Sequence, residues 1–170
     1  MSPASRLPPP ALIVIMGVAG SGKTTIGRQL AASLGWAYHE ADDFHSAANK
    51  EKMGRGIPLD DADRAPWLAA IRAAMEASLT AGRPAVFTCS ALKERYRHAL
   101  LDGLDGVALV HLAGDRNLLQ ARLQGRAGHY MKPAMLDSQL AALEPPADAL
   151  TLDIAQSPET LVAEIRRRLL

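Results

Sequence analysis

The sequence predicts an α/β domain with a parallel sheet, and three observations support this fold class. Short apolar runs rich in β-branched residues alternate with segments whose apolar residues recur at helical spacing. A glycine-rich loop follows the first apolar run and precedes the first helical segment. The chain has 170 residues, of which 48% are hydrophobic, enough for one sizeable core. We therefore expect a loose tail over residues 1–10 and a single domain over residues 11–170, with right-handed crossovers between strands.

The expected strands and helices follow one another along the whole chain. Strands are predicted at residues 11–16, 36–40, 85–88, 107–112 and 150–154. Helices are predicted at residues 24–34, 46–54, 66–81, 115–126 and 133–143, and from residue 157 onward. A further helix, after the third strand, is predicted to include residues 96 and 100. Ser46, Asp115 and Ser157 supply the side chains of N-caps, and Gly35 and Gly82 stand where helices end.

Composition narrows the classes of partner. The formal net charge is only +1, which argues against a nucleic-acid binder with a general basic surface. The apolar run at residues 11–16 is too short to span a membrane, and a glycine-rich loop follows it instead of a cleavage site. Cys89 is the only cysteine, so no internal disulfide can form and a cytoplasmic location is expected. Cys89 is most simply interpreted as a small buried apolar residue.

Residues 17–24 read Gly-Val-Ala-Gly-Ser-Gly-Lys-Thr and fit the phosphate-loop pattern G-x-x-x-x-G-K-[ST]. Glycines let the backbone turn its N–H groups inward, and the following helix adds the positive end of its dipole. Lys23 is expected to reach the β- and γ-phosphates, and Thr24 to offer its hydroxyl to Mg²⁺. A chance glycine-rich turn is the alternative, but a predicted strand before the loop and a helix after it favour a nucleotide site.

A phosphate loop does not by itself establish a kinase. The other class is a nucleotide switch or a regulatory module that binds nucleotide without transfer. A GTPase needs a base-recognition element such as Asn-Lys-x-Asp, and residues 49–52, Asn-Lys-Glu-Lys, lack the aspartate and lie too early in the chain.

An acidic stretch, Glu-Ala-Asp-Asp-Phe-His at residues 40–45, follows the second predicted strand. Loops at the carboxyl ends of strands carry the ligands of open α/β sheets. A carboxylate there can orient an attacking hydroxyl group or take its proton, although an acidic helix cap is the alternative.

At these residues the sequence resembles the gluconate kinase (gluconokinase) family, a branch of the small P-loop kinases. The resemblance extends over about residues 11–169. It is carried by Ala-Asp-Asp-Phe-His at 41–45, Asp-x-x-Asp-Arg-x-Pro-Trp-Leu at 60–68, Cys-Ser-Ala-Leu-Lys at 89–93, Arg-x-Gly-His-Tyr-Met at 126–131 and Leu-Glu-Pro at 143–145. One departure is Glu40, where relatives often have aspartate.

The resemblance implies a five-stranded sheet of order 2-3-1-4-5, a substrate-binding segment at about 42–66 and a mobile lid at about 122–136. It also implies ATP-dependent phosphorylation of D-gluconate, with Asp42 beside the acceptor hydroxyl, and it suggests a homodimer. A kinase of the same build acting on shikimate or a nucleotide is the nearest alternative.

Several cations are candidates for contacts with anions. Arg64 can grip a carboxylate bidentately, or instead pair with Asp60 or Asp61. Lys93 and Arg97 are one helical turn apart at the carboxyl edge of the sheet, where they would contact an anion or form a solvated face.

Arg122 and Arg126 are also spaced i, i+4, and glycines at 125 and 128 bracket the second of them. We interpret this segment as a flap whose arginines stabilise charge on the transferring phosphoryl group, with a solvated helix face as the alternative.

The predicted site therefore has four parts. The catalytic residues are Lys23, Asp42 and Arg126. ATP is held by Gly17, Gly20, Ser21, Gly22, Lys23, Thr24, Thr25 and Arg122. A small sugar acid is held by Asp42, His45, Arg64, Lys93 and Arg97. Thr24 is the metal ligand, for Mg²⁺.

Overall fold

The computed structural model describes residues 8–125 and 133–170 as a five-stranded parallel sheet flanked by helices. The strands are β1 (Leu12–Met16), β2 (Ala37–Glu40), β3 (Ala85–Thr88), β4 (Val107–Ala113) and β5 (Leu150–Asp153). They lie in the order β2-β3-β1-β4-β5, which confirms the predicted topology. All four pairings are parallel, with β1 between β3 and β4.

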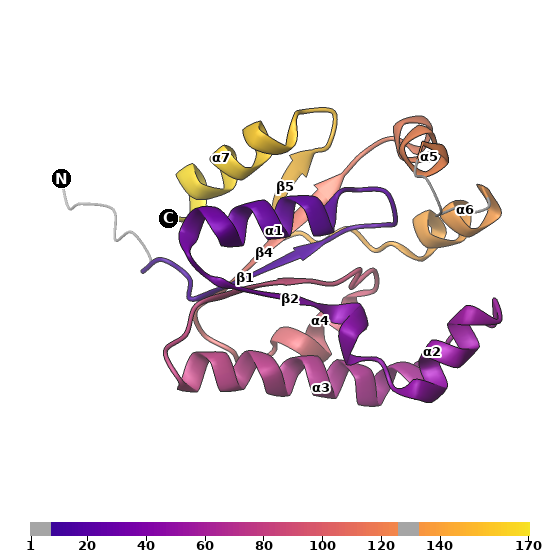
Figure 1. Ribbon diagram of the computed structural model, residues 1–170, viewed down its shortest axis with the longest axis horizontal. Helices are drawn as coiled ribbons and strands as arrows, with labels where there is room; N and C mark the ends of the chain where they lie inside the picture. Colours follow the sequence, from indigo (N-terminus) through magenta and orange to yellow (C-terminus); the bar gives the residue numbers. More distant parts are fainter. Residues whose placement is uncertain (1–7, 126–132) are drawn as a thin grey trace.

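Helices cover both faces of the sheet (Figure 1). One face carries α1 (Lys23–Leu34) and α7 (Pro158–Leu169), and the other carries α3 (Asp61–Thr80) and α4 (Glu94–Leu101). Because successive side chains of a strand point to opposite faces, β1 serves both layers. Ile13 and Ile15 pack toward α1 and α7, whereas Leu12 and Val14 pack toward α3 and α4. This double burial explains why β1 is apolar throughout.

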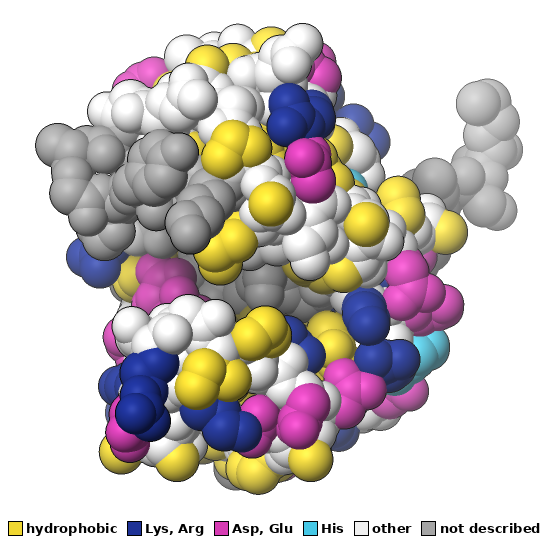
Figure 2. All heavy atoms as spheres, turned by 90° about the vertical axis from the view of Figure 1, so that its right-hand side faces the viewer, with side chains coloured by type: hydrophobic (Ala, Val, Ile, Leu, Met, Phe, Trp, Pro, Cys, Tyr) yellow, Lys and Arg dark blue, Asp and Glu magenta, His cyan; other side chains and the backbone are white. Residues whose placement is uncertain are grey.

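The remaining elements gather at the carboxyl edge of the sheet. They are the 3₁₀ helix η1 (Ala41–Phe44), α2 (Ala47–Gly54), α5 (Arg116–Gln124) and α6 (Pro133–Ala142). Figure 2 looks onto this edge, which is hollowed between the half with α5 and α6 and the half with α2 and α3. The larger of the two cavities described below takes its lining from both halves.

Local signals fixed most helix ends as predicted. The side chains of Ser46, Asp115 and Ser157 each accept a hydrogen bond from the backbone N–H three residues later. Gly35 ends α1 in the left-handed conformation.

The start of α3 differs from the prediction, which placed it at Pro66. The helix begins at Asp61, because Asp60 and Asp63 form a reciprocal capping box that satisfies the first N–H groups. Pro66 lies inside the first two turns. Its missing N–H therefore costs α3 one backbone hydrogen bond. None of the helices formed by the described residues is both long enough and apolar enough to cross a bilayer.

Candidate active site

The phosphate loop joins β1 to α1, and its glycines allow both an unusual backbone conformation and close packing against α5. Gly20 and Gly22 have φ angles of 82° and 92°, a region that side chains rarely adopt. A Cβ atom on Gly20 would also lie 2.9 Å from the Cγ of Leu123, so α5 packs directly on the loop. Lys23 begins α1, and its ammonium group donates to the carbonyl of Val18 at 3.1 Å. The loop is therefore already curled around its lysine.

Ser21 contributes differently from the other loop residues. Its side chain is fully buried, and its hydroxyl has no hydrogen-bond partner within the described part of the chain. Its backbone N–H donates to the carbonyl of Val18 at 3.2 Å, and its small side chain fills the space beside Gly17.

Thr24 lies beside an acidic group. Its hydroxyl donates to Oε2 of Glu40 at 3.0 Å, and the hydroxyl of Tyr38 donates to the same oxygen at 2.5 Å. The Tyr38 hydroxyl also lies 3.0 Å from that of Thr88 on the neighbouring strand. Burial, followed by the bond to Glu40, raises the pKa of Tyr38, so the phenol stays protonated. The longer side chain of Glu40 thus reaches the residue expected to bind the metal.

This oxygen-only arrangement fits Mg²⁺ brought in by a nucleotide. Magnesium prefers oxygen ligands and keeps several waters, using few protein groups together with phosphate oxygens. Across residues 8–125 and 133–170 there is no group of three His, Cys, Asp or Glu side chains that could hold a metal alone. Thr24, with Glu40 behind it, offers the oxygen ligands that Mg²⁺ prefers.

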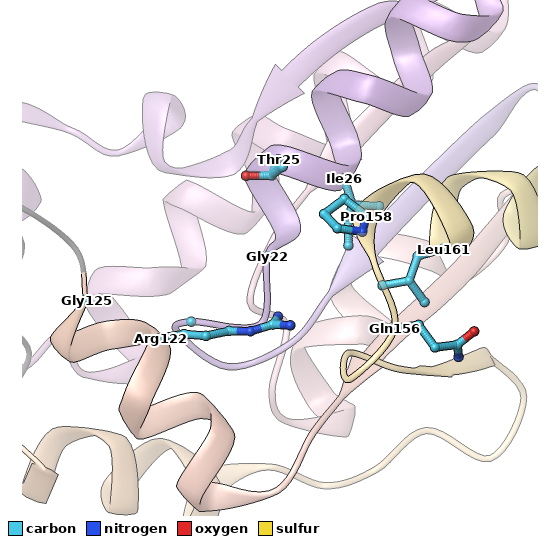
Figure 3. Close-up of a pocket in the computed structure, with 9 residues that line it drawn as sticks. Gly22, Thr25, Ile26, Arg122, Gly125, Gln156, Pro158 and Leu161 are labelled. Carbon is cyan, nitrogen blue, oxygen red and sulfur yellow. The ribbon is translucent and has the colours of Figure 1, made fainter.

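A cavity of about 300 Å³ extends from the phosphate loop to the β5–α7 connection and the start of α7. Its lining is Gly20, Gly22, Thr25, Ile26, Arg122, Gly125, Gln156, Pro158 and Leu161. Figure 3 shows the Arg122 side chain reaching from α5 toward the turn that carries Gln156. Its guanidinium donates to the carbonyl of Ile154. Thr25 and Arg122 thus border the predicted nucleotide side, whereas Arg126 and the middle of the predicted lid, residues 126–132, lie outside the described residues.

A larger cavity, of about 600 Å³, is lined by residues of η1, α2, α3 and α6 among others, and we call it the acceptor cleft. Its polar lining is Asp42, His45, Arg64, Ser90, Lys93, Tyr96, Ser138 and Gln139, and its apolar lining includes Met53, Ile57, Pro58, Leu59, Trp67 and Met135. The structure thus brings together four of the five residues predicted to bind the acceptor.

Asp42 and His45 take their places from η1 at the end of β2. The indole N–H of Trp67 donates to the carbonyl of Ala41 at 2.7 Å, which ties this turn to α3. The His45 ring stacks on Trp67, with centroids 4.3 Å apart and planes 10° from parallel. Asp43, the next carboxylate, does not border the acceptor cleft.

Arg64 extends from α3 into the acceptor cleft, where one guanidinium nitrogen donates to the Tyr96 hydroxyl at 3.2 Å. The predicted alternative, a pair with Asp61, is present only at 3.9 Å. Asp61 has a closer partner in Arg95 at 2.7 Å. Arg64 is therefore not needed to neutralise Asp61 and can meet an anion in the cleft.

Arg97 occupies a different place from the predicted one. It is buried, and its guanidinium donates to the carbonyls of Ala91, Leu92 and Glu144 at 2.8, 3.1 and 2.6 Å. The prediction assumed that residues 93 and 97 share a helix face, but Lys93 is the extended N-cap of α4 and only Arg97 is helical. Arg97 instead supports Ala91, which has a positive φ of 44° at the cleft wall.

Gln139 was missed by the sequence analysis. Its side-chain carbonyl accepts from the backbone N–H of Ala19 in the phosphate loop at 2.8 Å, and it also borders the acceptor cleft. Only the packing of α6 against the loop, 120 positions apart in the chain, reveals this contact.

Cys89 is a buried apolar residue, as expected. It is 3% exposed, and burial raises the pKa of its thiol to about 12. It is therefore protonated and unreactive near neutral pH.

A phosphate loop flanked by a nucleotide-side cavity and an acceptor cleft defines a P-loop phosphotransferase. A family model described as an AAA domain matches residues 12–146. A gluconokinase from Gluconobacter oxydans is 44% identical over 161 residues, covering 93% of this chain and 90% of the relative. The chain belongs to the gluconokinase family of P-loop kinases.

Solved structures agree with this assignment. A gluconokinase from Sinorhizobium meliloti is 41% identical with a TM-score of 0.81, covering 91% of this chain and 89% of that one. A sugar kinase from a Janibacter species is 43% identical with a TM-score of 0.84, and the match covers 94% of each chain.

Proposed function

We propose that this protein transfers the γ-phosphoryl group of Mg·ATP to the terminal 6-hydroxyl group of D-gluconate, giving 6-phospho-D-gluconate and ADP. The observation that carries the proposal is the acceptor cleft, which contains both a carboxylate, Asp42, and a guanidinium, Arg64, and whose Gln139 bonds to the phosphate loop. A polyol with one carboxylate needs both kinds of group. The names of the relatives supply the acceptor, because polar lining alone suits many small alcohols.

In this mechanism the chain contributes position and charge. The loop N–H groups and Lys23 hold the β- and γ-phosphates, and Arg122 borders the nucleotide side. Asp42 orients the hydroxyl and accepts its proton as the new O–P bond forms and the bond from phosphorus to ADP breaks. Mg²⁺, when bound at Thr24, neutralises charge on the phosphates.

At the other end of the substrate, the carboxylate meets Arg64 and Lys93, which lie in the same cleft. A guanidinium and a carboxylate match in bidentate geometry, and Tyr96 holds Arg64 in place from behind. His45 is placed to contact hydroxyl groups along the chain of the acid. Arg126 and the lid at about 122–136 keep their predicted role of closing over the phosphates.

The cytoplasmic location and the homodimer stay predictions, drawn from the single cysteine and the family resemblance.

A coupled assay of ADP release tests the proposal. The purified protein is offered D-gluconate, D-glucose, shikimate and nucleoside monophosphates under identical conditions with Mg·ATP. We expect turnover with gluconate and a much lower kcat/KM with the others, because polar groups built for a missing carboxylate are left unpaired. Equal turnover of glucose or shikimate would contradict the acceptor, and no ADP release with any acceptor would contradict transfer itself.

A further inference from the structure

Asn49 is a buried polar residue behind the acceptor cleft, on the first turn of α2. It is 6% exposed and does not line the cleft. Its side-chain nitrogen donates to the carbonyl of Asp63 at 2.9 Å and lies 3.3 Å from Nδ1 of His45. It therefore connects α2 and α3 at the point where both contact His45.

The chemistry of these three groups fixes the orientation of the amide. A backbone carbonyl can only accept, so the NH₂ end of Asn49 must face Asp63. The second N–H of that nitrogen then meets His45 Nδ1, which must offer a lone pair. A neutral imidazole that accepts at Nδ1 carries its proton on Nε2.

The surroundings of His45 favour the neutral ring. Burial is the main effect, and it lowers the pKa of His45. Arg64 on α3 and Lys50 on α2 act in the same direction, whereas Asp42 on η1 opposes them. Trp67 of α3 stacks on the flat side of the ring and adds no charge. Protonation would also draw His45 toward Asp42 and occupy the carboxylate that the acceptor hydroxyl needs.

We infer that Asn49 is a positioning residue that holds His45 as the neutral Nε2–H tautomer, so that His45 presents a hydrogen-bond donor to a hydroxyl group of the acceptor. The acceptor's identity rests on the proposed function, but the tautomer does not. Asp42 and His45 then have complementary roles, one accepting and one donating. This pairing suits a hydroxylated substrate, whose hydroxyl groups both donate and accept.

Nitrogen-15 NMR of protein labelled in histidine tests the tautomer without any turnover. The His45 signals are assigned by their loss in His45→Gln, and two-bond correlations report which nitrogen bears the proton. In the wild type at pH 7 we expect a proton on Nε2 alone. In Asn49→Ala we expect mixed tautomers and a higher pKa, because Nδ1 is released and water enters.

Asn117→Ala is the matched control, since Asn117 is the other asparagine of the chain and is exposed on α5. It should leave the His45 signals unchanged. A wild-type ring that is charged at pH 7 or protonated on Nδ1 overturns the inference, even if Asn49→Ala fails to fold. A folded Asn49→Ala protein with unchanged His45 nitrogen shifts overturns it as well.

A pair of substitutions tests the function of the donor. The amide nitrogen of glutamine can take the place of Nε2, whereas that of asparagine lies nearer the place of Nδ1. His45→Gln should therefore retain about tenfold more kcat/KM for gluconate than His45→Asn, the effect of one hydrogen bond in a desolvated site. Equal losses contradict the donor role. If the wild type does not turn over gluconate at all, the proposed function fails while the NMR result still decides the tautomer.

Discussion

The phosphate loop and the acceptor cleft are joined by a hydrogen bond from Ala19 to Gln139, but they differ in how their residues are distributed along the sequence. The loop is a run of eight consecutive residues, and its shape follows from glycines, a strand before it and a helix after it. The cleft takes its lining from residues between 42 and 142, which belong to η1, α2, α3, α4, α6 and the α2–α3 and β3–α4 connections. The difference teaches that a short run of consecutive residues can specify phosphate binding, whereas the choice of acceptor depends on tertiary packing.

The largest effect on activity is expected in the phosphate loop. Lys23→Ala removes a positioned cation from the β- and γ-phosphates, and we expect kcat to fall by about 10²–10³-fold, as for loss of one preorganised donor. Steady-state kinetics at saturating ATP and gluconate measure it. Thermal unfolding should be nearly unchanged, and near-normal turnover in a folded variant would remove Lys23 from the mechanism.

The next prediction compares adjacent carboxylates on η1. Asp42→Asn keeps the shape but removes the base, and kcat should fall on the order of a hundredfold or more, the usual contribution of a positioned acid–base group. Asp43→Asn is the matched control, because Asp43 is also exposed but lies outside the acceptor cleft. Equal losses in the two variants would leave the role of Asp42 without support.

Arg64→Ala tests recognition of the carboxylate. We expect kcat/KM for gluconate to fall by about 10–100-fold, in line with hydrogen bonds to charged groups, while the weak activity with glucose changes little. The measured quantity is the ratio of the two kcat/KM values. Arg72→Ala is the control, because Arg72 is also on α3 but pairs with Glu76 and does not line the acceptor cleft. An equal fall in kcat/KM for glucose would show that Arg64 does not recognise the carboxylate.

Arg97→Ala should affect stability more than recognition. It leaves the buried carbonyls of Ala91, Leu92 and Glu144 without their donor, at a cost of about 1–3 kcal/mol. In a chain of this size each kcal/mol lowers the Tm by about 2–4 °C. Calorimetry measures the change, and an unchanged Tm with a large rise in the KM for gluconate would restore Arg97 as a substrate ligand.

The smallest effect is expected at the hydrogen bond between Gln139 of the acceptor cleft and Ala19 of the phosphate loop. Gln139→Ala releases the N–H of Ala19, and we expect about a fivefold loss of kcat/KM for ATP, the value of one net hydrogen bond. Gln29→Ala, at an exposed position on α1, is the control. A loss confined to gluconate, with ATP unaffected, would mean that Gln139 belongs to the acceptor cleft alone.

The sequence by itself determined the fold class, the phosphate loop and nearly all the strands. These features depend on periods of two and 3.6 residues and on short motifs, so the information lies within a few positions. The order of the strands came from the family resemblance, since periodicity does not say which strands are neighbours. The predicted start of α3 at Pro66 is wrong although the signal is local, because the capping pair Asp60 and Asp63 begins the helix at Asp61.

Only the tertiary structure decided which polar side chains share a space. The spacing of Lys93 and Arg97 predicted one shared face, but Lys93 is the extended N-cap of α4, and Arg97 is buried. Gln139 joined the site because α6 packs on a loop 120 positions earlier. The role of Asn49 depends on its contacts with the carbonyl of Asp63 and the ring of His45, which no local sequence pattern brings together. The physical reason is that hydrogen bonds act over about 3 Å in space, whatever the distance along the chain.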